Sequence, residues 1–388
     1  MPRNSRKRKT KAPDKHFPEG ILFDIVSRLP VKSVVRCTTV SKSWYALIKS
    51  RDFIATHVKQ SIASNINDDS SHYILDLLLD EHGDKPCVVL RDNVVSFDPV
   101  YSVDLPMDFE LRKCKMVGSC NGLVCLTGTS CFADGCLIYL WNPLLRRIKR
   151  ISCTSSCCNR LYRKFTNVGF WYDNEKNDYK LIMIRHYINK GLPQNDKEQS
   201  QVELYSLYTA SWRKIDDVKM PGILLDGAAV FVDGSLNWIA YHSLERTYSI
   251  LSFDTRLEVF REMKLPNYDH YNSVIPYLVV YKGCLALFVA HCTGEEDVLS
   301  LWVMKEFGLA ESWLEEYHVV FEVDCIFSVG FTKNSVIIYA TYDEMFVYDF
   351  EKKQSRDIGL GFRCDADSLV EYTESLVLLD EKNELQEN

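Results

Sequence analysis

The stretch FPEGILFDIVSRLPVKSVVRCTTVSKSWYALIKSRDFIATHV, residues Phe17–Val58, decides how this chain is organised. Nearly half of its side chains are large and apolar. A segment of roughly 40 residues is too short to bury that many apolar side chains in a core of its own. It must therefore pack against something else.

The apolar residues of this stretch recur at helical spacing. One wide apolar face combines Ile21, Leu22, Ile25, Val26 and Leu29. Pro18 suits the first turn of this helix, because proline presets φ and its missing N–H would have no partner there. Pro30 ends the helix.

Two further helices are predicted after Pro30. Residues Lys32–Cys37 form a short second helix, and Ser41 is a good N-cap for a third. The third helix presents Trp44, Leu47 and Ile48 on one side. The apolar face continues through Phe53, Ile54 and Val58, which are compatible with a fourth helix.

Spacing alone leaves two interpretations open. The helices are either a cap that packs on the domain behind them or a docking module whose apolar stripe binds a partner chain. The stretch resembles the F-box almost position for position, at Pro18, Ile21, Ile25, Leu29, Pro30, Val34, Arg36, Val40, Ser41 and Trp44. It departs from the motif at Phe17, where leucine is usual, and at Gly20, which costs about 0.5–1 kcal/mol relative to alanine.

This resemblance favours the docking module and implies its partner. F-boxes bind the Skp-type linker protein and, through it, the cullin-RING ligase core. The residues that the resemblance assigns to the linker-binding surface are Pro18, Ile21, Ile25, Leu29, Pro30, Val34, Val40, Ser41 and Trp44.

Size and composition predict a large globular domain plus something small, since the chain has 388 residues of which 46% are hydrophobic. No run approaches 18 apolar residues, and no apolar segment follows the basic N-terminus. We therefore expect neither a membrane span nor a signal peptide, and a location in the cytoplasm, the nucleus or both.

Charge is unevenly distributed along the chain. Residues 1–15 hold seven basic side chains and one acidic one, a net +6, whereas the whole chain carries −7, which leaves −13 on the remainder. An acidic body argues against a nucleic-acid-binding surface there, because phosphate contacts need clustered positive charge. The basic tail is either a nuclear-import signal or a solvated, disordered start.

A repeat organises the rest of the chain. Apolar runs that end in an aromatic residue and a turn former recur, as in IYLWNPLLRRI and SILSFDTRLEVFREM. The aromatic anchors are Phe97, Trp141, Tyr205, Phe253, Trp302 and Tyr348, at separations of 44, 64, 48, 49 and 46 residues. The longest interval contains the polar stretch Asn189–Gln201, which we interpret as a loop insertion.

Tight hairpins alternate with these anchors. Their predicted turns lie near Gly122, Gly234, Gly283 and Asn334. Asn-Gly and Asp-Gly pairs suit a two-residue type I′ turn, because both central residues take positive φ. A weaker hairpin, GFWYDNEKNDYKLIMI, fills the interval between Trp141 and Tyr205.

Four strands in each period of 40 to 50 residues are the size of a propeller blade. We predict about six four-stranded blades, closed by pairing of Ser368–Leu379 with the strands around Tyr73–Leu79. A β-sandwich is the alternative, but it would not demand so regular a period. The fold class is thus α+β in separate domains, a three-helix F-box followed by an all-β propeller-like domain.

The expected domain boundaries follow from these patterns. They are a basic disordered tail (1–15), the F-box (16–60), a polar linker (61–71), the propeller-like domain (72–380) and an acidic tail (381–388).

The body also resembles a known family. The runs SCNGLVCL, LWNPLLRRIKRI and WVMKEFGLAESW are similar to the F-box-associated (type 1) domain of plant F-box proteins, including F-box/kelch-type proteins. The likeness extends to the S-locus F-box subgroup, from which these residues do not separate the chain.

No constellation predicts catalysis, a cofactor or a metal. Eight cysteines crowd between Cys114 and Cys158 without a C-x-x-C pair or an intervening histidine, so we interpret them as small buried hydrophobes. The stretch Gly118–Gly122 fits G-x-C-x-G, but a nucleophile elbow needs a following helix, and a strand pattern follows. The periodic tryptophans Trp141, Trp212, Trp302 and Trp313 are predicted as blade core.

The predicted function is target recognition in a Skp–cullin–F-box ubiquitin ligase, without catalysis by this chain. The target is unidentified, and the loops Cys153–Lys164, Asn189–Gln201 and Pro266–Asn272 are candidates for binding it, because recognition residues concentrate on loops of a rigid scaffold. The alternative is a propeller scaffold or nuclear regulator that joins no ligase.

Overall fold

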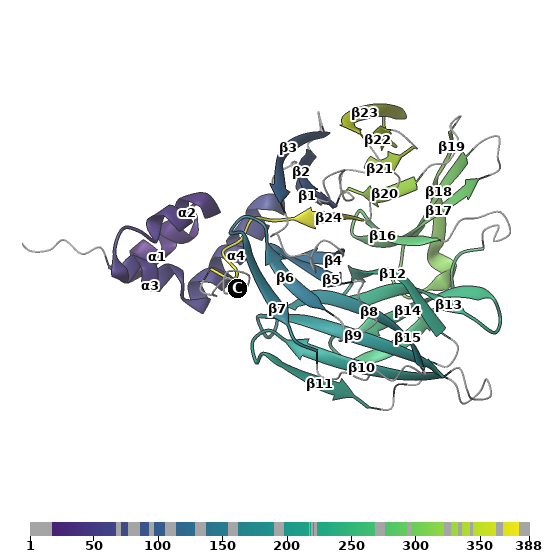
Figure 1. Ribbon diagram of the computed structural model, residues 1–388. Coiled ribbons are helices and arrows are strands. Elements are labelled where there is room, and N and C mark those ends of the chain that lie inside the picture. Colours follow the sequence, from purple (N-terminus) through teal and green to yellow (C-terminus); the bar gives the residue numbers. More distant parts are fainter. Residues whose placement is uncertain are drawn as a thin grey trace, which may run out of the picture.

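The computed structural model describes residues 18–66, 71–76, 86–92, 97–104, 114–128, 137–153, 162–189, 198–216, 218, 220, 223–267, 276–292, 297–321, 327–332, 336–341, 344–361 and 368–379. A helical module, residues 18–66, stands beside a β-propeller (Figure 1). The basic tail 1–15, the acidic tail 381–388 and residues 67–70 of the predicted linker lie outside the described residues.

The helical module contains the helices that the sequence predicts and a long fourth one: α1 (Glu19–Ser27), α2 (Val31–Cys37), α3 (Lys42–Ile48) and α4 (Arg51–Ile66). The N-cap prediction is confirmed, since the Ser41 hydroxyl accepts a hydrogen bond from the Trp44 amide at 3.2 Å. Pro18 occupies the N-cap position and not the first turn of α1, and Pro30 has the same place before α2.

Helix α4 is longer than predicted, because it takes in residues 61–66 of the expected polar bridge. Its apolar residues Ile54, Val58 and Ile62 are spaced by four and pack against a hydrophobic cluster of the propeller. That stripe continues the helical period past the module, so packing on the second domain extends the helix.

Six antiparallel sheets of four strands each follow. Three of them are β24 (Ser368–Tyr372), β1 (Ser71–Asp76), β2 (Pro86–Asp92) and β3 (Phe97–Asp104); β4 (Cys114–Cys120), β5 (Leu123–Gly128), β6 (Ile138–Asn142) and β7 (Arg147–Ile151); and β8 (Tyr162–Asp173), β9 (Asp178–Asn189), β10 (Glu198–Ser206) and β11 (Ser211–Ile215). The other three are β12 (Ile223–Val232), β13 (Ser235–His242), β14 (Thr247–Asp254) and β15 (Val259–Met263); β16 (Tyr277–Tyr281), β17 (Cys284–Cys292), β18 (Asp297–Met304) and β19 (Trp313–Phe321); and β20 (Phe327–Phe331), β21 (Val336–Ala340), β22 (Glu344–Asp349) and β23 (Gln354–Gly361).

These sheets are the blades of a six-bladed propeller, as predicted. The first strands β4, β8, β12, β16, β20 and β24 contact one another in that order and close into a ring around the axis. The predicted closure is confirmed too, because β24 pairs with β1 and places Glu371 opposite Tyr73. One blade is thus built from both ends of the β domain, which a β-sandwich would not require.

Three of the predicted hairpin turns have the expected backbone. Both central residues take positive φ in the pairs Asn121–Gly122, Asp233–Gly234 and Lys282–Gly283. This is the type I′ geometry that matches the twist of the flanking strands. The weaker hairpin is confirmed by the pairing of Asp173 with Asp178, while Asn334 lies outside the described residues.

Five of the six aromatic anchors lie on the third strand of a blade: Trp141, Tyr205, Phe253, Trp302 and Tyr348. Phe97 is the exception, since it begins β3, the fourth strand of its blade. The third strand there is β2, whose Val89 and Leu90 are completely buried. The anchor pattern fits both β2 and the apolar run that contains Phe97. The prediction took the later run as the third strand, and the third strand is β2.

The predicted loop insertion Asn189–Gln201 is also shorter than expected. Strand β9 ends at Asn189, strand β10 begins at Glu198, and Glu198 pairs with Ile188. Residues 198–201 therefore extend a long hairpin, because alternating side chains on a paired strand tolerate polar residues on one face.

Candidate functional site

The helical module has an apolar core of its own. Val26, Val31, Val34, Ile48 and Phe53 are at most 3% exposed and form one cluster. One further member comes from the far end of the chain, Leu376.

His57 joins two helices of this module. Its imidazole Nε2 lies 2.9 Å from the carbonyl oxygen of Leu29, just beyond the end of α1. Burial lowers the pKa of His57, while the hydrogen bond to Leu29 opposes that shift. The side chain ties α4 to the end of α1 and braces the surface that α1 presents.

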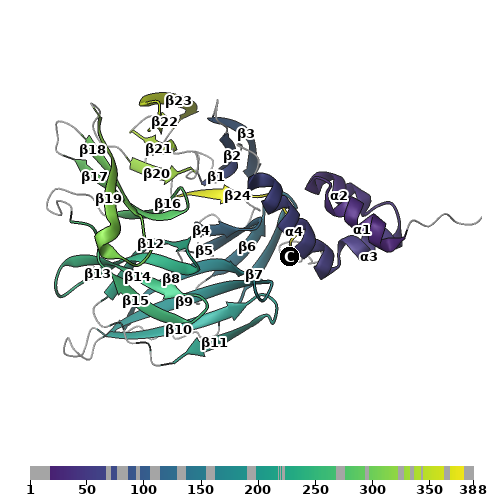
Figure 2. The same ribbon diagram turned by 180° about the vertical axis from the view of Figure 1, so that it is seen from behind.

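A second set of apolar side chains in the module faces solvent. Ile21 is 51% exposed, Ile25 52%, Val40 61% and Tyr45 48%. Ile21 and Ile25 lie one turn apart on α1, whereas Val40 precedes the N-cap of α3 and Tyr45 lies on α3. In Figures 1 and 2, α4 lies between these helices and the propeller.

The structure confirms the first interpretation of the helical spacing, while the second, binding of a partner chain, stays a prediction. Part of the apolar surface packs on the rest of the chain through α4 and Leu376, and another part is exposed on the helices farther from the propeller. Four large exposed hydrophobes within 25 residues form the kind of surface that a partner chain covers.

The structure sorts the nine residues assigned to linker binding. Six of them are exposed: Pro18, Ile21, Ile25, Pro30, Val40 and Ser41. Leu29 and Trp44 are half-buried and pack against the core cluster of the module.

Val34 is the exception, because its side chain is 0% exposed. It lies on the inward side of α2 and packs in the module's core with Val31, so it supports the surface from within, and all nine assignments to linker binding stay predictions. Tyr45 was missed.

The propeller has two faces that the strand order distinguishes. We call proximal the face that bears the turns from first to second and from third to fourth strands. The helical module contacts this face: Leu144, in the β6–β7 turn, packs against its core cluster, and the Arg51 guanidinium lies 4.6 Å from the ring centroid of Tyr208 in the β10–β11 turn.

The three candidate target-binding loops leave the opposite, distal face. Cys153–Lys164 and Pro266–Asn272 join a fourth strand to the next first strand, and Asn189–Gln201 joins a second strand to a third. Antiparallel alternation puts all these strand ends on the distal side. The interiors of the three loops, residues 154–161, 190–197 and 268–275, lie outside the described residues.

A cavity of about 520 Å³ runs between the first strands at the centre of the ring. Apolar side chains and glycines line most of it. Tyr277, 46% exposed, and Asp226 lie toward its distal end, and burial together with the Asp226 carboxylate raises the pKa of Tyr277.

Two serine–histidine–glutamate groups occur among the described residues, and neither has the geometry of a catalytic triad. His318 Nδ1 lies 3.1 Å from Ser300 Oγ and 3.1 Å from Glu315 Oε1. A triad needs the serine and the acid on opposite ring nitrogens, so that one nitrogen takes the proton while the other is held.

The second group repeats this arrangement. His242 Nε2 faces both Ser249 Oγ, at 2.8 Å, and Glu262 Oε1, at 3.0 Å. One nitrogen again serves both partners, so neither group resembles a hydrolase site.

The thiol of the elbow-like sequence is not activated. Cys120 ends β4, a strand follows the turn, and burial raises its pKa to about 12. A thiol with that pKa stays protonated at neutral pH and is a poor nucleophile.

Metal sites and membrane spans can be judged only for the described part of the chain. There, no three His, Cys, Asp or Glu side chains are grouped so that they could hold a metal ion. None of the helices in the described ranges is long and apolar enough to span a membrane.

Comparison with known proteins agrees with this architecture. The family model "F-box domain" matches residues 15–56, and "F-box associated beta propeller domain" matches residues 68–377.

Relatives from Arabidopsis thaliana match more than three quarters of this chain. "F-box protein At3g07870" is 27% identical over 335 residues, 78% of this chain and 72% of that protein. "F-box/kelch-repeat protein At3g23880" is 27% identical, covering 77% of this chain and 78% of its own length. "F-box protein CPR1" is 28% identical, covering 78% and 73% respectively. The chain therefore belongs to the plant F-box proteins that carry a C-terminal F-box-associated β-propeller domain.

Proposed function

We propose that this protein is the target-recognition subunit of a Skp–cullin–F-box ubiquitin ligase. One observation carries the proposal: the helical module fills its own core and still exposes Ile21, Ile25, Val40 and Tyr45. A Skp-type linker protein would cover these side chains and connect the chain to the cullin-RING core.

The proposed action is geometric and not chemical. The propeller would hold an unidentified target protein while the linker anchors the complex, so that target lysines meet the charged ubiquitin-conjugating enzyme. Tethering of this kind raises the effective concentration of the lysine to about the millimolar range. We propose the distal face as the target-binding side, because the three candidate loops leave from it and the helical module contacts the proximal face.

The compartment is also a proposal. The acidic body and the basic residues 1–15 are compatible with work in the cytoplasm, the nucleus or both. A fluorescent fusion with and without residues 1–15 tests whether the tail directs nuclear import.

The test of linker binding uses exposed residues. Ile25→Asp together with Val40→Asp should abolish co-purification with a recombinant Skp-type linker, because two charges would be buried at the interface. Leu257→Asp, at a propeller leucine that is 60% exposed, is the matched control and should bind as the unaltered chain does.

Leu29 and Trp44 are weaker choices for this test, because both pack against the module's own core and their loss would also disturb folding. Retained co-purification of the double variant, with an unchanged circular dichroism spectrum, would show that the linker binds another surface. Failure of the unaltered chain to co-purify with the linker would favour the rival function of a scaffold or regulator outside any ligase.

A further inference from the structure

The C-terminal segment Thr373–Leu379, which we call the strap, follows the ring-closing strand β24 and enters the junction between propeller and helical module. Ser375, Leu376, Val377 and Leu378 are 1%, 0%, 8% and 4% exposed. Figures 1 and 2 show this last segment, in yellow, beside α4.

The propeller binds the strap by hydrogen bonds to the backbone of the strap. Asn142, at the end of β6, donates from Nδ2 to the carbonyl oxygens of Ser375, at 3.0 Å, and Val377, at 2.8 Å. The Leu144 amide donates to the Tyr372 hydroxyl at 3.2 Å, where the strap begins. Asn142 is itself 0% exposed, which makes this a sealed contact.

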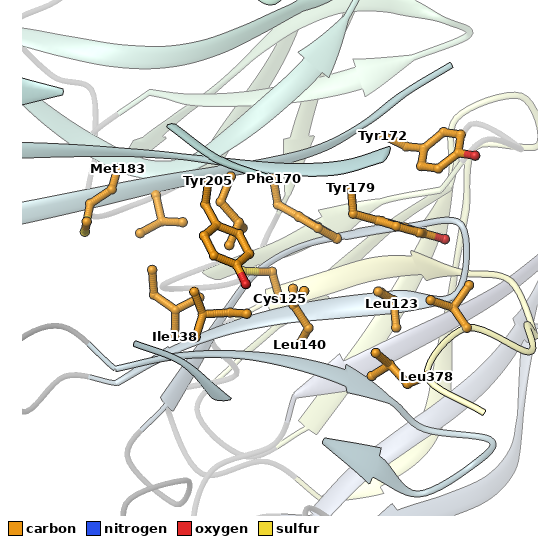
Figure 3. Packing of buried hydrophobic residues seen from close by; sticks show 14 of the residues in the cluster. Leu123, Cys125, Ile138, Leu140, Phe170, Tyr172, Tyr179, Met183, Tyr205 and Leu378 are labelled. Carbon is orange, nitrogen blue, oxygen red and sulfur yellow. The ribbon is translucent and has the colours of Figure 1, made fainter. Parts of the chain in front are cut away.

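Side chains of the strap add a second anchor on the propeller. Val377 and Leu378 belong to the cluster between the two neighbouring blades β4–β7 and β8–β11. Figure 3 shows Leu378 at one end of this cluster, near Leu123 and Tyr179. Gly122 lies so close to the strap that a Cβ there would collide with Ser375 and the Thr373 carbonyl.

The helical module receives the middle of the strap. Leu376 packs in the module's core with Val34, Ile48 and Phe53, and Leu379 lies at the edge of that core. An ion pair joins Glu374 to Lys32 of α2 at 3.4 Å, but its lysine is 64% exposed, so it contributes little. Adjacent residues of one short segment thus fill the cores of both domains.

We infer that Leu376 and Asn142 are positioning residues that fix the angle between the linker-binding surface and the propeller. The inference rests on the proposed ligase function for its purpose, but its structural part stands alone. The module cannot turn relative to the ring without withdrawing Leu376 from one core or freeing the carbonyls that Asn142 holds. If this angle is fixed, ubiquitin can be transferred only to lysines that lie in one region around the propeller, and therefore only to one set of target lysines.

The structural part is tested without a partner. Spin labels on noncanonical residues at Lys42 of α3 and Lys214 of β11, both exposed, report the distance between module and propeller in the full-length chain. We expect one narrow distance distribution. Asn142→Ala and Leu376→Ala should each broaden it, Leu376→Met should restore it, and Leu257→Ala should leave it unchanged.

Two outcomes would overturn the inference. One is a distribution that stays narrow in both alanine variants. The other is loss of amide protection in α3 on Leu376→Ala while Asn142→Ala keeps the original distance, since Leu376 would then be a core residue without a linking role. Asn142→Ala leaves the module's core intact, so the measurement remains readable even where Leu376→Ala unfolds the helices.

The functional part uses the chain as its own substrate. In a ligase reconstituted with linker, cullin, RING protein and conjugating enzyme, mass spectrometry should find ubiquitin on a restricted set of propeller lysines. Asn142→Ala should spread modification over more lysines at unchanged linker binding. An unchanged pattern would overturn the positioning role, whereas failure of the unaltered chain to bind the linker would overturn the proposed function and leave the distance measurement standing.

Discussion

The indole Nε1 of Trp313 donates a hydrogen bond to the carbonyl oxygen of Lys264 at 3.1 Å. Trp313 begins β19, the outermost strand of its blade, and Lys264 directly follows β15, the outermost strand of the preceding blade. Trp212 on β11 bonds the Ser152 carbonyl after β7 in the same way, at 2.8 Å. Both tryptophans are half-buried and join neighbouring blades at the rim. They also pack against the hydrophobic core clusters, so the prediction of blade core holds for them in part.

Loss of one of these hydrogen bonds between blades should lower the free energy of unfolding only slightly when the side chain keeps an aromatic ring. We expect Trp313→Phe to lower the free energy of unfolding by about 1 kcal/mol, the net value of one hydrogen bond, and Trp313→Ala by about 3 kcal/mol. Denaturant unfolding measures both. Trp212→Phe is the matched variant, and a loss larger than about 2 kcal/mol for either phenylalanine would show that the indole does more than bridge two blades.

Two glycines in equivalent turns separate backbone strain from contact with the strap. Gly122 has φ +83° and Gly234 has φ +71°, but only at Gly122 would a Cβ meet other atoms. Gly234→Ala should cost about 1 kcal/mol for the left-handed conformation alone. Gly122→Ala should cost clearly more and raise amide exchange in residues 373–379. If Gly122→Ala and Gly234→Ala lowered the thermal stability equally, the strap would be able to move away from the added Cβ at no energetic cost.

Substitution of only one partner of a buried ion pair in blade β8–β11 should strongly destabilise the fold. Arg185 and Glu203 are 0% and 2% exposed and are joined through Arg185 Nη1. Glu203→Leu leaves a buried guanidinium without its carboxylate, and we expect a loss of about 3–5 kcal/mol in urea unfolding. Combination with Arg185→Met should recover much of that loss. If the two substitutions lowered the free energy of unfolding by amounts that simply add, Arg185 and Glu203 would not be energetically coupled.

The stability of the propeller should fall in mild acid. Burial lowers the pKa of His186 from 6.5 to about 4, so the folded state keeps this side chain neutral. Below pH 6.5 this histidine binds a proton in the unfolded chain but not in the folded chain. The free energy of unfolding therefore decreases as the pH falls toward 4, by about 3 kcal/mol at most. His186→Gln should flatten that part of the pH profile of unfolding, and a profile unchanged by the substitution would assign the loss to other groups.

Local chemistry made much of the fold predictable. The pairs Asn121–Gly122 and Asp233–Gly234 predict their turns because few other pairs accept two positive φ values, and the number of aromatic anchors, six, predicts the number of blades. Phe97 failed because β2 and the run after it satisfy the same apolar pattern, and pattern alone does not say which of two adjacent runs is the third strand.

The site was predictable only in part, for a similar reason. Helical spacing shows which side chains share a face but not what covers that face. Val34 and Ile25 both fit the motif, yet Val34 is buried and Ile25 half exposed, because α2 turns its valine toward Ile48 and Phe53. Leu376 lies more than 300 residues away in a run that otherwise looks like strand, so nothing local links it to the helices.

The placement of Leu376 also has a consequence for how the protein is made. The helices leave the ribosome before the propeller, but their core lacks one member until translation has passed residue 376. A product of premature termination before residue 376 would have an incomplete helical core, and one that ends before β24 would also have an open ring with an unpaired strand edge, the features by which chaperones and proteases recognise faulty chains. Only a chain translated through residue 376 would then have a complete helical core.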